Sequence, residues 1–355
     1  MVQHFLFKLL LAPFSLLYGM GVSLRNLLYQ YGLLKSVEFN IPIISVGNLS
    51  VGGAGKSPHI EYLVRLLKDY VEVATLSRGY RRKTKGYLMI GQDMSVEQGG
   101  DEPLQFKRKF PEMGVFVSES RTFAIPKILM DRPDTQVVLL DDAFQHRAIK
   151  PGLNILLTEF SHPFTQDYLL PSGRLREWRS AYERADVIVV TKCPANVSEA
   201  ERQQAIREIK PLTHQRLFFS YFEYDLPYYI FNPRFRVNLE KDTDVLLVSA
   251  IARTDYLTEY LNTMVNAVYL LEYEDHHYFT QQDAAQISAT FERLESKKKL
   301  IITTEKDAVR LEMHRSYFID QRLPLVVLPA KVAFHFEEGV QFDELVRQFL
   351  LNFKA

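Results

Sequence analysis

The stretch SVGNLSVGGAGKS, residues 45–57, decides the fold class of this chain. It follows an apolar run at 41–46 that is typical of a buried strand, and a helical pattern begins directly after it. Glycines let backbone N–H groups approach a phosphate chain, and the next helix directs its amino terminus at the phosphates. In such a loop Lys56 reaches the β and γ phosphates and the Ser57 hydroxyl binds Mg²⁺.

The strict form of this loop has glycine five residues before Gly55, where this chain has Ser50. A glycine-rich turn that binds no nucleotide is the alternative. The Gly-Lys-Ser core and its position between strand and helix favour a nucleotide. The predicted nucleotide-binding residues are Gly52, Gly53, Ala54, Gly55, Lys56 and Ser57.

Further along the chain, apolar runs without polar alternation alternate with helical patterns. The predicted strands are 41–46, 71–76, 115–117, 137–140, 154–157 and 187–190, with helices at 58–68, 102–110 and 121–130. This alternation predicts an α/β fold of the P-loop NTPase type, with a mainly parallel sheet and helices on both faces.

A change of character near residue 218 suggests a second lobe. The stretch 218–238 is aromatic and interrupted by proline, and strand–helix alternation resumes from 244. We therefore predict apolar and amphipathic helices at 1–36, a nucleotide-binding domain at 37–220, a β-type linker at 221–240 and a smaller α/β lobe at 241–355.

The amino terminus is almost wholly apolar over residues 5–24, with Lys8 and Pro13 as interruptions, and 24–34 form an amphipathic stripe. Three interpretations stay open: a helix packed on the protein's own core, a helix at a membrane interface, and a membrane-spanning helix.

Composition excludes several classes of protein. Apolar residues make up 47% and charged residues 24% of the 355 residues, as in folded globular proteins. The formal net charge is zero, which argues against a non-specific nucleic-acid binder. The single cysteine, Cys193, excludes an internal disulfide and a multi-cysteine metal site.

Two acidic motifs are candidates for chemistry. The strand at 137–140 leads into Asp141 and Asp142, and an acid at this place binds Mg²⁺ in P-loop enzymes. GDEP at 100–103 precedes a helix, so its acids either cap that helix or supply a base or metal ligand.

Other motifs are ambiguous on their own. YEDHHYF at 273–279 is either a surface turn or a proton-transfer or metal site. The basic segments RGYRRKTK, residues 78–85, and RLREWR, residues 174–179, are either solvated loops or phosphate-recognition sites.

Taken together, the motifs resemble those of the tetraacyldisaccharide 4'-kinase family of lipid A biosynthesis. The pieces are VGNLSVGGAGKSP, LSRGY, GDEP, LLDDAFQHR, LLPSGRLRE, EDHH and TTEKDAVR, in the family's order from residue 46 to 310. The chain departs from the family where proline is common, at Arg174 and Trp178, so substrate contacts there would differ.

The resemblance implies roles for individual residues. Asp101 would be the catalytic acid–base and His276 its partner, while Ser57, Glu102 and Asp142 would hold the metal. Asp141, Gln145 and His146 would lie near the metal or phosphate, and Arg78, Arg81, Arg174 and Arg176 are candidates for substrate binding.

The implied reaction transfers the γ-phosphate of ATP, with Mg²⁺, to the 4'-hydroxyl of an acylated glucosamine disaccharide 1-phosphate lipid. It would take place at the cytoplasmic face of the inner membrane, with no nucleic acid and no obligate protein partner. One alternative is a P-loop GTPase or metal-insertion switch, although TKCP at 191–194 lacks the guanine-reading aspartate. The other is a soluble small-molecule kinase, which leaves the apolar amino terminus unexplained.

Overall fold

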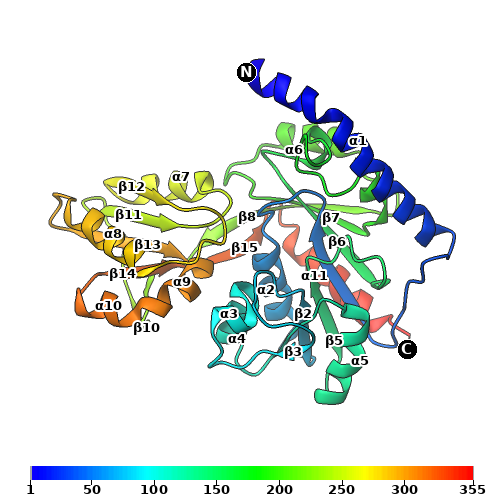
Figure 1. The fold of residues 1–355 in the computed structure, drawn as a ribbon, viewed down its shortest axis with the longest axis horizontal. Helices are drawn as coiled ribbons and strands as arrows, with labels where there is room; N and C mark the ends of the chain where they lie inside the picture. Colours follow the sequence, from blue (N-terminus) through cyan, green and yellow to red (C-terminus); the bar gives the residue numbers. More distant parts are fainter. Residues whose placement is uncertain (1, 355) are drawn as a thin grey trace.

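The computed structural model describes residues 2–354, with side chains from residue 10 onward. It has two lobes side by side (Figure 1). The first lobe is built on a nine-stranded sheet with the order β15-β8-β7-β6-β1-β5-β2-β4-β3. These strands are β1 Ile43–Asn48, β2 Val73–Ser77, β3 Leu88–Met89, β4 Gly114–Val117, β5 Val137–Asp141, β6 Leu153–Glu159, β7 Val187–Thr191, β8 Arg216–Tyr224 and β15 Ala330–Phe334.

The second lobe contains a six-stranded sheet with the order β10-β9-β14-β13-β11-β12. Its strands are β9 Tyr228–Tyr229, β10 Asn232–Arg236, β11 Asp244–Ser249, β12 Ala267–Glu272, β13 Lys299–Thr304 and β14 Leu325–Leu328. In both sheets the central strands are parallel, and antiparallel pairing is confined to the edges. The predicted α/β class with a mainly parallel sheet is confirmed.

Helices cover both sheets. They are α1 Val2–Gln30, α2 Lys56–Leu67, α3 Val96–Gly99, α4 Asp101–Lys109, α5 Arg121–Asp131, α6 Glu199–Ile209, α7 Asp255–Met264, α8 Gln281–Glu292, α9 Glu305–Leu311, α10 Arg315–Asp320 and α11 Gly339–Leu351. Short 3-10 helices add Phe164–Gln166, Arg179–Arg184 and Glu312–His314.

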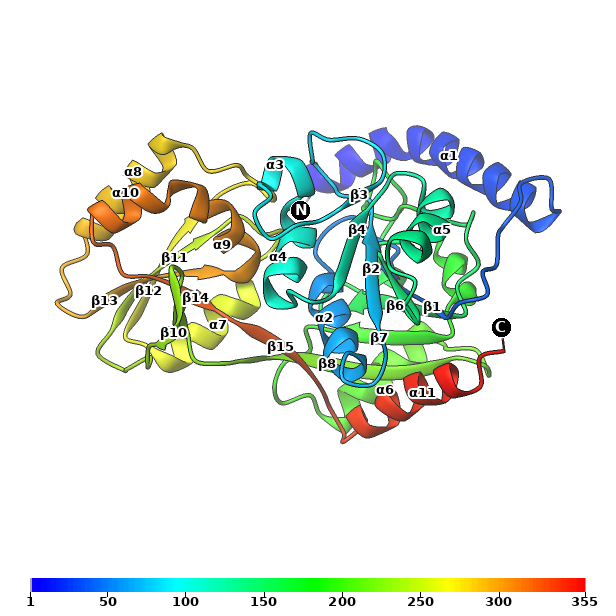
Figure 2. The same cartoon turned by 90° about the horizontal axis from the view of Figure 1, so that it is seen from below.

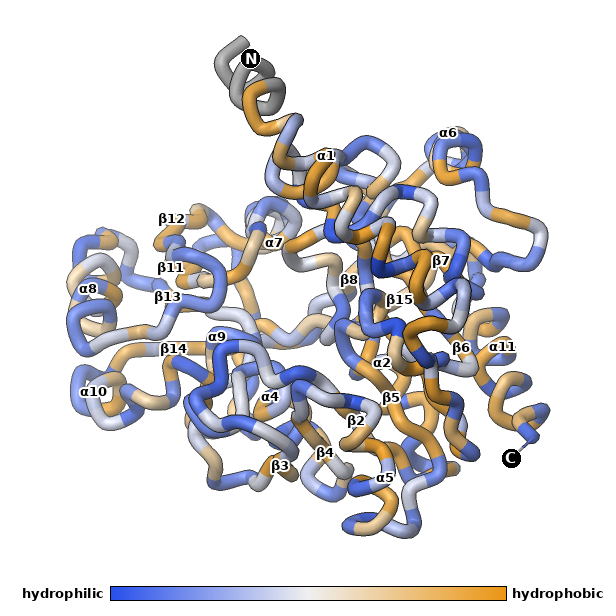
Figure 3. The backbone as a smooth tube through the Cα atoms, turned by 45° about the vertical axis from the view of Figure 1, so that its right-hand side comes forward, coloured by the Kyte–Doolittle hydropathy of each residue, from blue (hydrophilic) through white to orange (hydrophobic). Residues whose placement is uncertain are grey.

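Burial explains why the central strands form. Every residue of β1 is buried, and neighbours along it enter different cores, Ile44 on one face and Ile43 on the other. A strand covered on both faces favours the continuous Val, Ile and Leu runs that the sequence shows. The apolar segments lie mainly inside each lobe (Figure 3).

The chain crosses between the lobes twice, along β8 and again along β15 (Figure 2). Strand β15 pairs antiparallel with β8, and Phe342 and Val346 of α11 join the core of the first lobe. The predicted second lobe at 241–355 therefore ends earlier, because β15 and α11 belong to the first lobe. The return was not predictable from local pattern because β15 resembles any short strand.

Helix α1 packs along the first lobe through specific contacts. Arg25 forms an ion pair of 3.0 Å with the fully buried Glu177, and the Trp178 indole donates to the Ser23 hydroxyl at 2.9 Å. Large apolar side chains on the same helix stay exposed, including Phe14 and Leu17. No helix among residues 2–354 is long and apolar enough to cross a membrane.

Candidate active site

The phosphate-binding loop follows the central strand β1 and leads into α2. Gly52 and Gly55 have φ of 113° and 83°, a left-handed conformation that favours glycine. Helix α2 begins at Lys56, so its first N–H groups lack intrahelical partners and face the loop. The Lys56 ammonium donates to the Asn48 side chain at 3.1 Å and lies 3.8 Å from an Asp142 oxygen. This geometry suits a bound anion.

Asp141, the last residue of β5, and Asp142 lie beside this loop, because β5 pairs directly with β1 in parallel and Val46 aligns with Asp141. The Arg176 guanidinium donates hydrogen bonds to both carboxylate oxygens of Asp142, at 2.9 and 3.0 Å. Burial would raise the pKa of Asp142, but Lys56 and Arg176 outweigh it and hold the pKa well below its usual value. Asp142 is therefore an ionised carboxylate that lies between the cations of Lys56 and Arg176.

Asp141 is different, although it is the adjacent residue. It is fully buried and its Oδ1 has no hydrogen-bond partner. Burial, with the nearby charges of Glu102 and Asp142, raises its pKa to about 7. A buried carboxylate with an oxygen that accepts no hydrogen bond is suited to bind a cation, so Asp141 fits a metal ligand at least as well as the predicted Asp142.

The described residues contain no group of three His, Cys, Asp or Glu side chains placed to hold a metal by themselves. Mg²⁺ at nucleotide sites is bound by one or two carboxylates together with phosphates and waters. The donor set of Ser57, Glu102 and the two aspartates is therefore suited to Mg²⁺ on a nucleotide rather than to a metal bound by protein alone.

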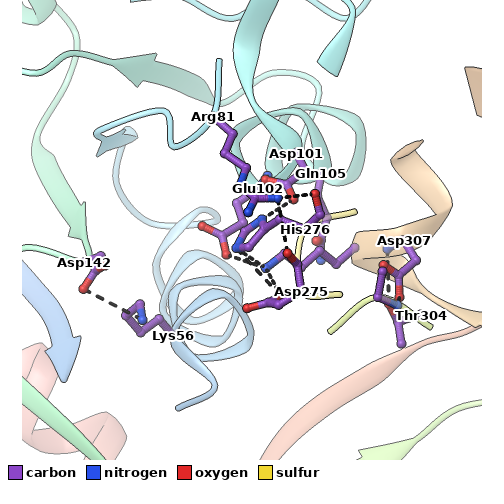
Figure 4. A network of polar contacts seen from close by, with 12 residues as sticks. Lys56, Arg81, Asp101, Glu102, Gln105, Asp142, Asp275, His276, Thr304 and Asp307 are labelled. Carbon is purple, nitrogen blue, oxygen red and sulfur yellow. Dashed lines mark hydrogen bonds and ion pairs between the residues drawn. The ribbon is translucent and has the colours of Figure 1, made fainter. Parts of the chain in front are cut away.

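Asp101 and His276 meet across the two lobes (Figure 4). Asp101 is the first residue of α4, and His276 lies in the loop after β12 with φ of 61°. His276 Nδ1 lies 2.8 Å from Asp101 Oδ2. The Arg81 guanidinium donates to the His276 carbonyl at 2.7 Å, which fixes this loop against the first lobe.

The charge around Asp101 is strongly positive. Burial would raise the Asp101 pKa, but the hydrogen bond from His276 and the charges of Lys306 and Arg310 hold it well below its usual value. Lys306 Nζ lies 3.0 Å from His276 Nε2 and 3.3 Å from a Glu102 oxygen. Burial lowers the pKa of Lys306, but neighbouring carboxylates led by Glu102 outweigh it and raise that pKa.

Sequence reasoning gave no role to Lys306 or Arg310. They lie in the motif TTEKDAVR, and their spacing of four residues on α9 places both toward α4. That spacing was the signal available, but a lysine and an arginine one turn apart occur on many solvent-exposed helices.

Most residues of the two sets line one cleft of about 970 Å³ between the lobes, while Asp101 and Asp141 are buried outside its lining. Its lining includes the following predicted site residues: Gly52, Gly53, Gly55, Lys56, Ser57, Arg81, Glu102, Asp142, Arg174, Arg176 and His276. Arg174 is held by Asp167 at 3.1 Å.

Other predicted residues stand outside the lining of this cleft. Gln145 donates to the Asn48 carbonyl at 2.9 Å, and Arg78 is exposed. His146 has a pKa lowered to about 4, because of burial and the nearby charges of Arg121, Arg78 and Arg25. Gln145 therefore contacts the last residue of β1, just before the loop, while Arg78 and His146 lie near each other.

The chain is similar to known proteins along nearly its whole length. The sequence profile described as tetraacyldisaccharide-1-P 4'-kinase matches residues 7–350. The tetraacyldisaccharide 4'-kinase of Parabacteroides distasonis is 44% identical over 348 residues, 96% of this chain and 94% of that protein. The enzyme of the same name from Phocaeicola vulgatus is 40% identical over 347 residues, 96% of this chain and 94% of that protein.

A solved structure agrees with these relatives. The crystal structure of the "apo" form of LpxK from Aquifex aeolicus in complex with ATP superposes with a TM-score of 0.73 at 29% identity. The match covers 97% of this chain and 99% of that one. This chain belongs to the tetraacyldisaccharide-1-P 4'-kinase family.

Proposed function

We propose that this chain transfers the γ-phosphate of ATP to the 4'-hydroxyl of a tetraacyldisaccharide 1-phosphate lipid, a step of lipid A biosynthesis. The observation that carries the proposal is the hydrogen-bonded pair of Asp101 and His276 beside the same cleft as the phosphate-binding loop. A P-loop alone binds a nucleotide, whereas a proton acceptor opposite it suits an alcohol as the second substrate.

On the phosphate side, Lys56 and the first N–H groups of α2 bind the β and γ phosphates. Arg176 keeps Asp142 ionised and oriented next to Lys56. Mg²⁺, when bound with the nucleotide, neutralises the charge that develops on the phosphates. Ser57, Glu102, Asp142 and the unsatisfied Asp141 are the residues that would hold it.

On the acceptor side, the Asp101 carboxylate accepts the proton of the attacking hydroxyl. Its lowered pKa makes it a weak base, which is sufficient because phosphoryl transfer passes through a loose transition state with little early proton transfer. His276 orients the carboxylate through its Nδ1 hydrogen bond.

The lipid would approach from the side of α1. Its exposed apolar side chains suit a membrane interface, and we propose peripheral attachment at the cytoplasmic face of the inner membrane. Arg81, Arg174 and Arg176 line the cleft and are candidates for the anionic groups of the lipid, with Arg78 close by in sequence.

The test of the reaction is phosphate transfer from radiolabelled ATP to purified tetraacyldisaccharide 1-phosphate in detergent. The wild-type chain is expected to give a product labelled at the 4' position. Lys56→Ala is the control that removes nucleotide chemistry without touching the acceptor side. Wild-type protein that hydrolyses ATP but labels no lipid would contradict the proposal.

The membrane contact has its own test. Replacing Phe14 and Leu17 together with glutamate changes exposed side chains and leaves the Arg25–Glu177 ion pair in place. Flotation with anionic lipid vesicles should fall for this double variant, while ATP binding stays at the wild-type level. Equal flotation of the wild type and the double variant would show that these side chains of α1 do not contact the membrane.

A GTP-dependent switch is the second candidate. TKCP follows β7, and Lys192 lies 4.8 Å above the Tyr256 ring at the cleft, as a base-packing lysine would. Pro194 occupies the place of the guanine-reading aspartate. Competition of GTP with ATP distinguishes the two, since a strong preference for GTP would contradict the kinase assignment.

A further inference from the structure

The proposed mechanism gives no role to the motif TEKDAVR at residues 304–310. Thr304 caps α9 by accepting from the Asp307 N–H at 3.1 Å. Helix α9 then packs against α4 of the other lobe, with Arg310 Nη1 3.4 Å from Asp101 Oδ2. The motif thus contacts the pair of Asp101 and His276, and its first three residues, Thr304, Glu305 and Lys306, line the cleft.

Lys306 contacts Nε2 of His276, the ring nitrogen that does not contact Asp101. Its ammonium lies 3.0 Å from Nε2, while Asp101 Oδ2 lies 2.8 Å from Nδ1. The side chains are mostly buried, with exposed fractions of 20% for Lys306 and 15% for His276. The imidazole is held between a cation and a carboxylate.

The other charged and titratable groups around this imidazole are few. They are Glu102 from α4, Asp275 from the histidine's own loop, Arg310 from α9, and Tyr80 and Arg81 from the loop after β2.

The hydrogen-bonding roles follow from chemistry. A lysine ammonium is a donor only, so Nε2 must present its lone pair. An ionised carboxylate is an acceptor only, so Nδ1 must carry the proton. Resting on the proposed function, we propose that Lys306 is a positioning residue that keeps Nε2 free of a proton and so fixes His276 as an Nδ1–H donor to Asp101.

A buried scaffold holds Lys306 in place. Asp307, which is fully buried, pairs with Arg310 and accepts from the Ala250 N–H at 3.1 Å. The Ala250 carbonyl in turn accepts from Arg310 Nη2 and from the His276 N–H, each at 3.1 Å. The helix that carries Lys306 and the loop that carries His276 are therefore tied to the same residue.

Charge balance for Glu102 alone is the competing explanation, because Lys306 also contacts that carboxylate. The two explanations differ in what happens at the imidazole. If Lys306 only neutralises Glu102, its loss leaves the proton positions on His276 unchanged. If it positions His276, its loss lets Nε2 carry a proton.

Nitrogen chemical shifts of isotope-labelled histidine separate these outcomes without substrate or turnover, so failure of this inference is distinguishable from failure of the proposed function. The chain has nine histidines, and a His276→Gln spectrum identifies the relevant signal. At neutral pH we expect a protonated Nδ1 and a bare Nε2 in the wild type. Lys306→Met should protonate Nε2, and Lys306→Arg should retain the wild-type pattern.

Kinetics provide the second readout. Lys306→Met should lower kcat roughly 10–100-fold, as for a misplaced catalytic group, with KM for ATP within about threefold of wild type. Lys306→Arg should recover part of the loss. Lys299→Met is the matched control, because Lys299 donates to the Phe291 and Leu294 carbonyls away from the cleft. A wild-type Nε2–H, or identical His276 spectra in the wild type and Lys306→Met, would overturn the inference.

Discussion

The two sides of the cleft are held in different ways. On the phosphate side, Lys56, Asp142 and Arg176 all belong to the first lobe, and adjacent parallel strands bring the first two together. On the acceptor side, Asp101 comes from the first lobe while His276, Lys306 and Arg310 come from the second. The contacts of the phosphate side therefore form within one lobe, whereas the pair of Asp101 and His276 forms only when both lobes are in contact.

The largest effect should follow Lys56→Ala, which removes the cation of the phosphate side. We expect phosphate transfer to fall about 10³-fold and ATP affinity to fall at least about tenfold, because the loss affects ground state and transition state alike. Isothermal titration with ATP and single-turnover transfer measure the two. Unchanged ATP affinity would break the assignment of this loop.

Asp307→Asn tests the scaffold of the acceptor side. It removes one of the two carboxylates that contact the buried Arg310 guanidinium, and Asp101 remains at 3.4 Å. We therefore expect a loss of stability below the ~3–5 kcal/mol that a wholly unpaired buried charge costs. Thermal unfolding should show a clearly lower melting temperature than for Asp225→Asn, which removes an exposed pair with Lys331. Equal melting temperatures would show that the buried pair does not stabilise the second lobe.

Removing the charge of Asp141 should raise the stability of the fold, whereas removing the charge of the neighbouring Asp142 should lower it. The Asp141 pKa is raised to about 7 in the folded state, so its ionisation destabilises the fold as pH rises from about 4 to 7. The Asp142 pKa is lowered, so its ionised form stabilises the fold at neutral pH and that stability is lost in acid.

In metal-free buffer at about pH 8, Asp141→Asn should therefore melt roughly 2–4 °C higher than wild type and Asp142→Asn lower. The gain for Asp141→Asn should shrink at about pH 5, where the wild-type carboxyl is protonated. Differential scanning calorimetry at both pH values is the measurement. A destabilised Asp141→Asn at about pH 8 would contradict the buried, unsatisfied carboxylate.

The smallest effect is expected at the surface contact between the lobes. Arg108 of α4 pairs with Glu312 beyond α9, and both side chains are about one-third exposed. A double-mutant cycle with alanine at both positions should give a coupling energy below about 1 kcal/mol and turnover within about twofold of wild type. A large coupling would mean that surface charge, rather than the buried set around Asp101, holds the lobes together.

The structure brings the predicted residues of the phosphate side together, and the sequence features that place them are local. The strand preceding Gly52 and the strand ending at Asp141 are continuous apolar runs, and adjacency of parallel strands at one sheet edge follows from the fold class. The free oxygen of Asp141, in contrast, depends on which acid Arg176 grips, and no spacing rule gives that choice.

The roles expected for the residues of the acceptor side came mainly from the resemblance to the kinase family. From the sequence pattern alone, Asp101 is either a helix cap or a base, and His276 lies either in a surface turn or in a functional site. The two residues are 175 positions apart in sequence, and their contact depends on how the two lobes pack. Lys306 had only its four-residue spacing from Arg310 as a local signal, and that spacing is common on solvent-exposed helices. The return of β15 to the first sheet was missed for the same reason, since sheet membership is a tertiary property.

The acceptor side is expected to act in phosphate transfer and not in nucleotide binding. Asp101→Asn removes the carboxylate base while retaining its size, so ATP affinity and single-turnover transfer to the lipid should be measured on this one variant. We expect ATP affinity within about threefold of wild type and transfer slower by about 10²–10⁴-fold. Transfer at the wild-type rate, or a loss of ATP affinity as large as that of Lys56→Ala, would contradict it.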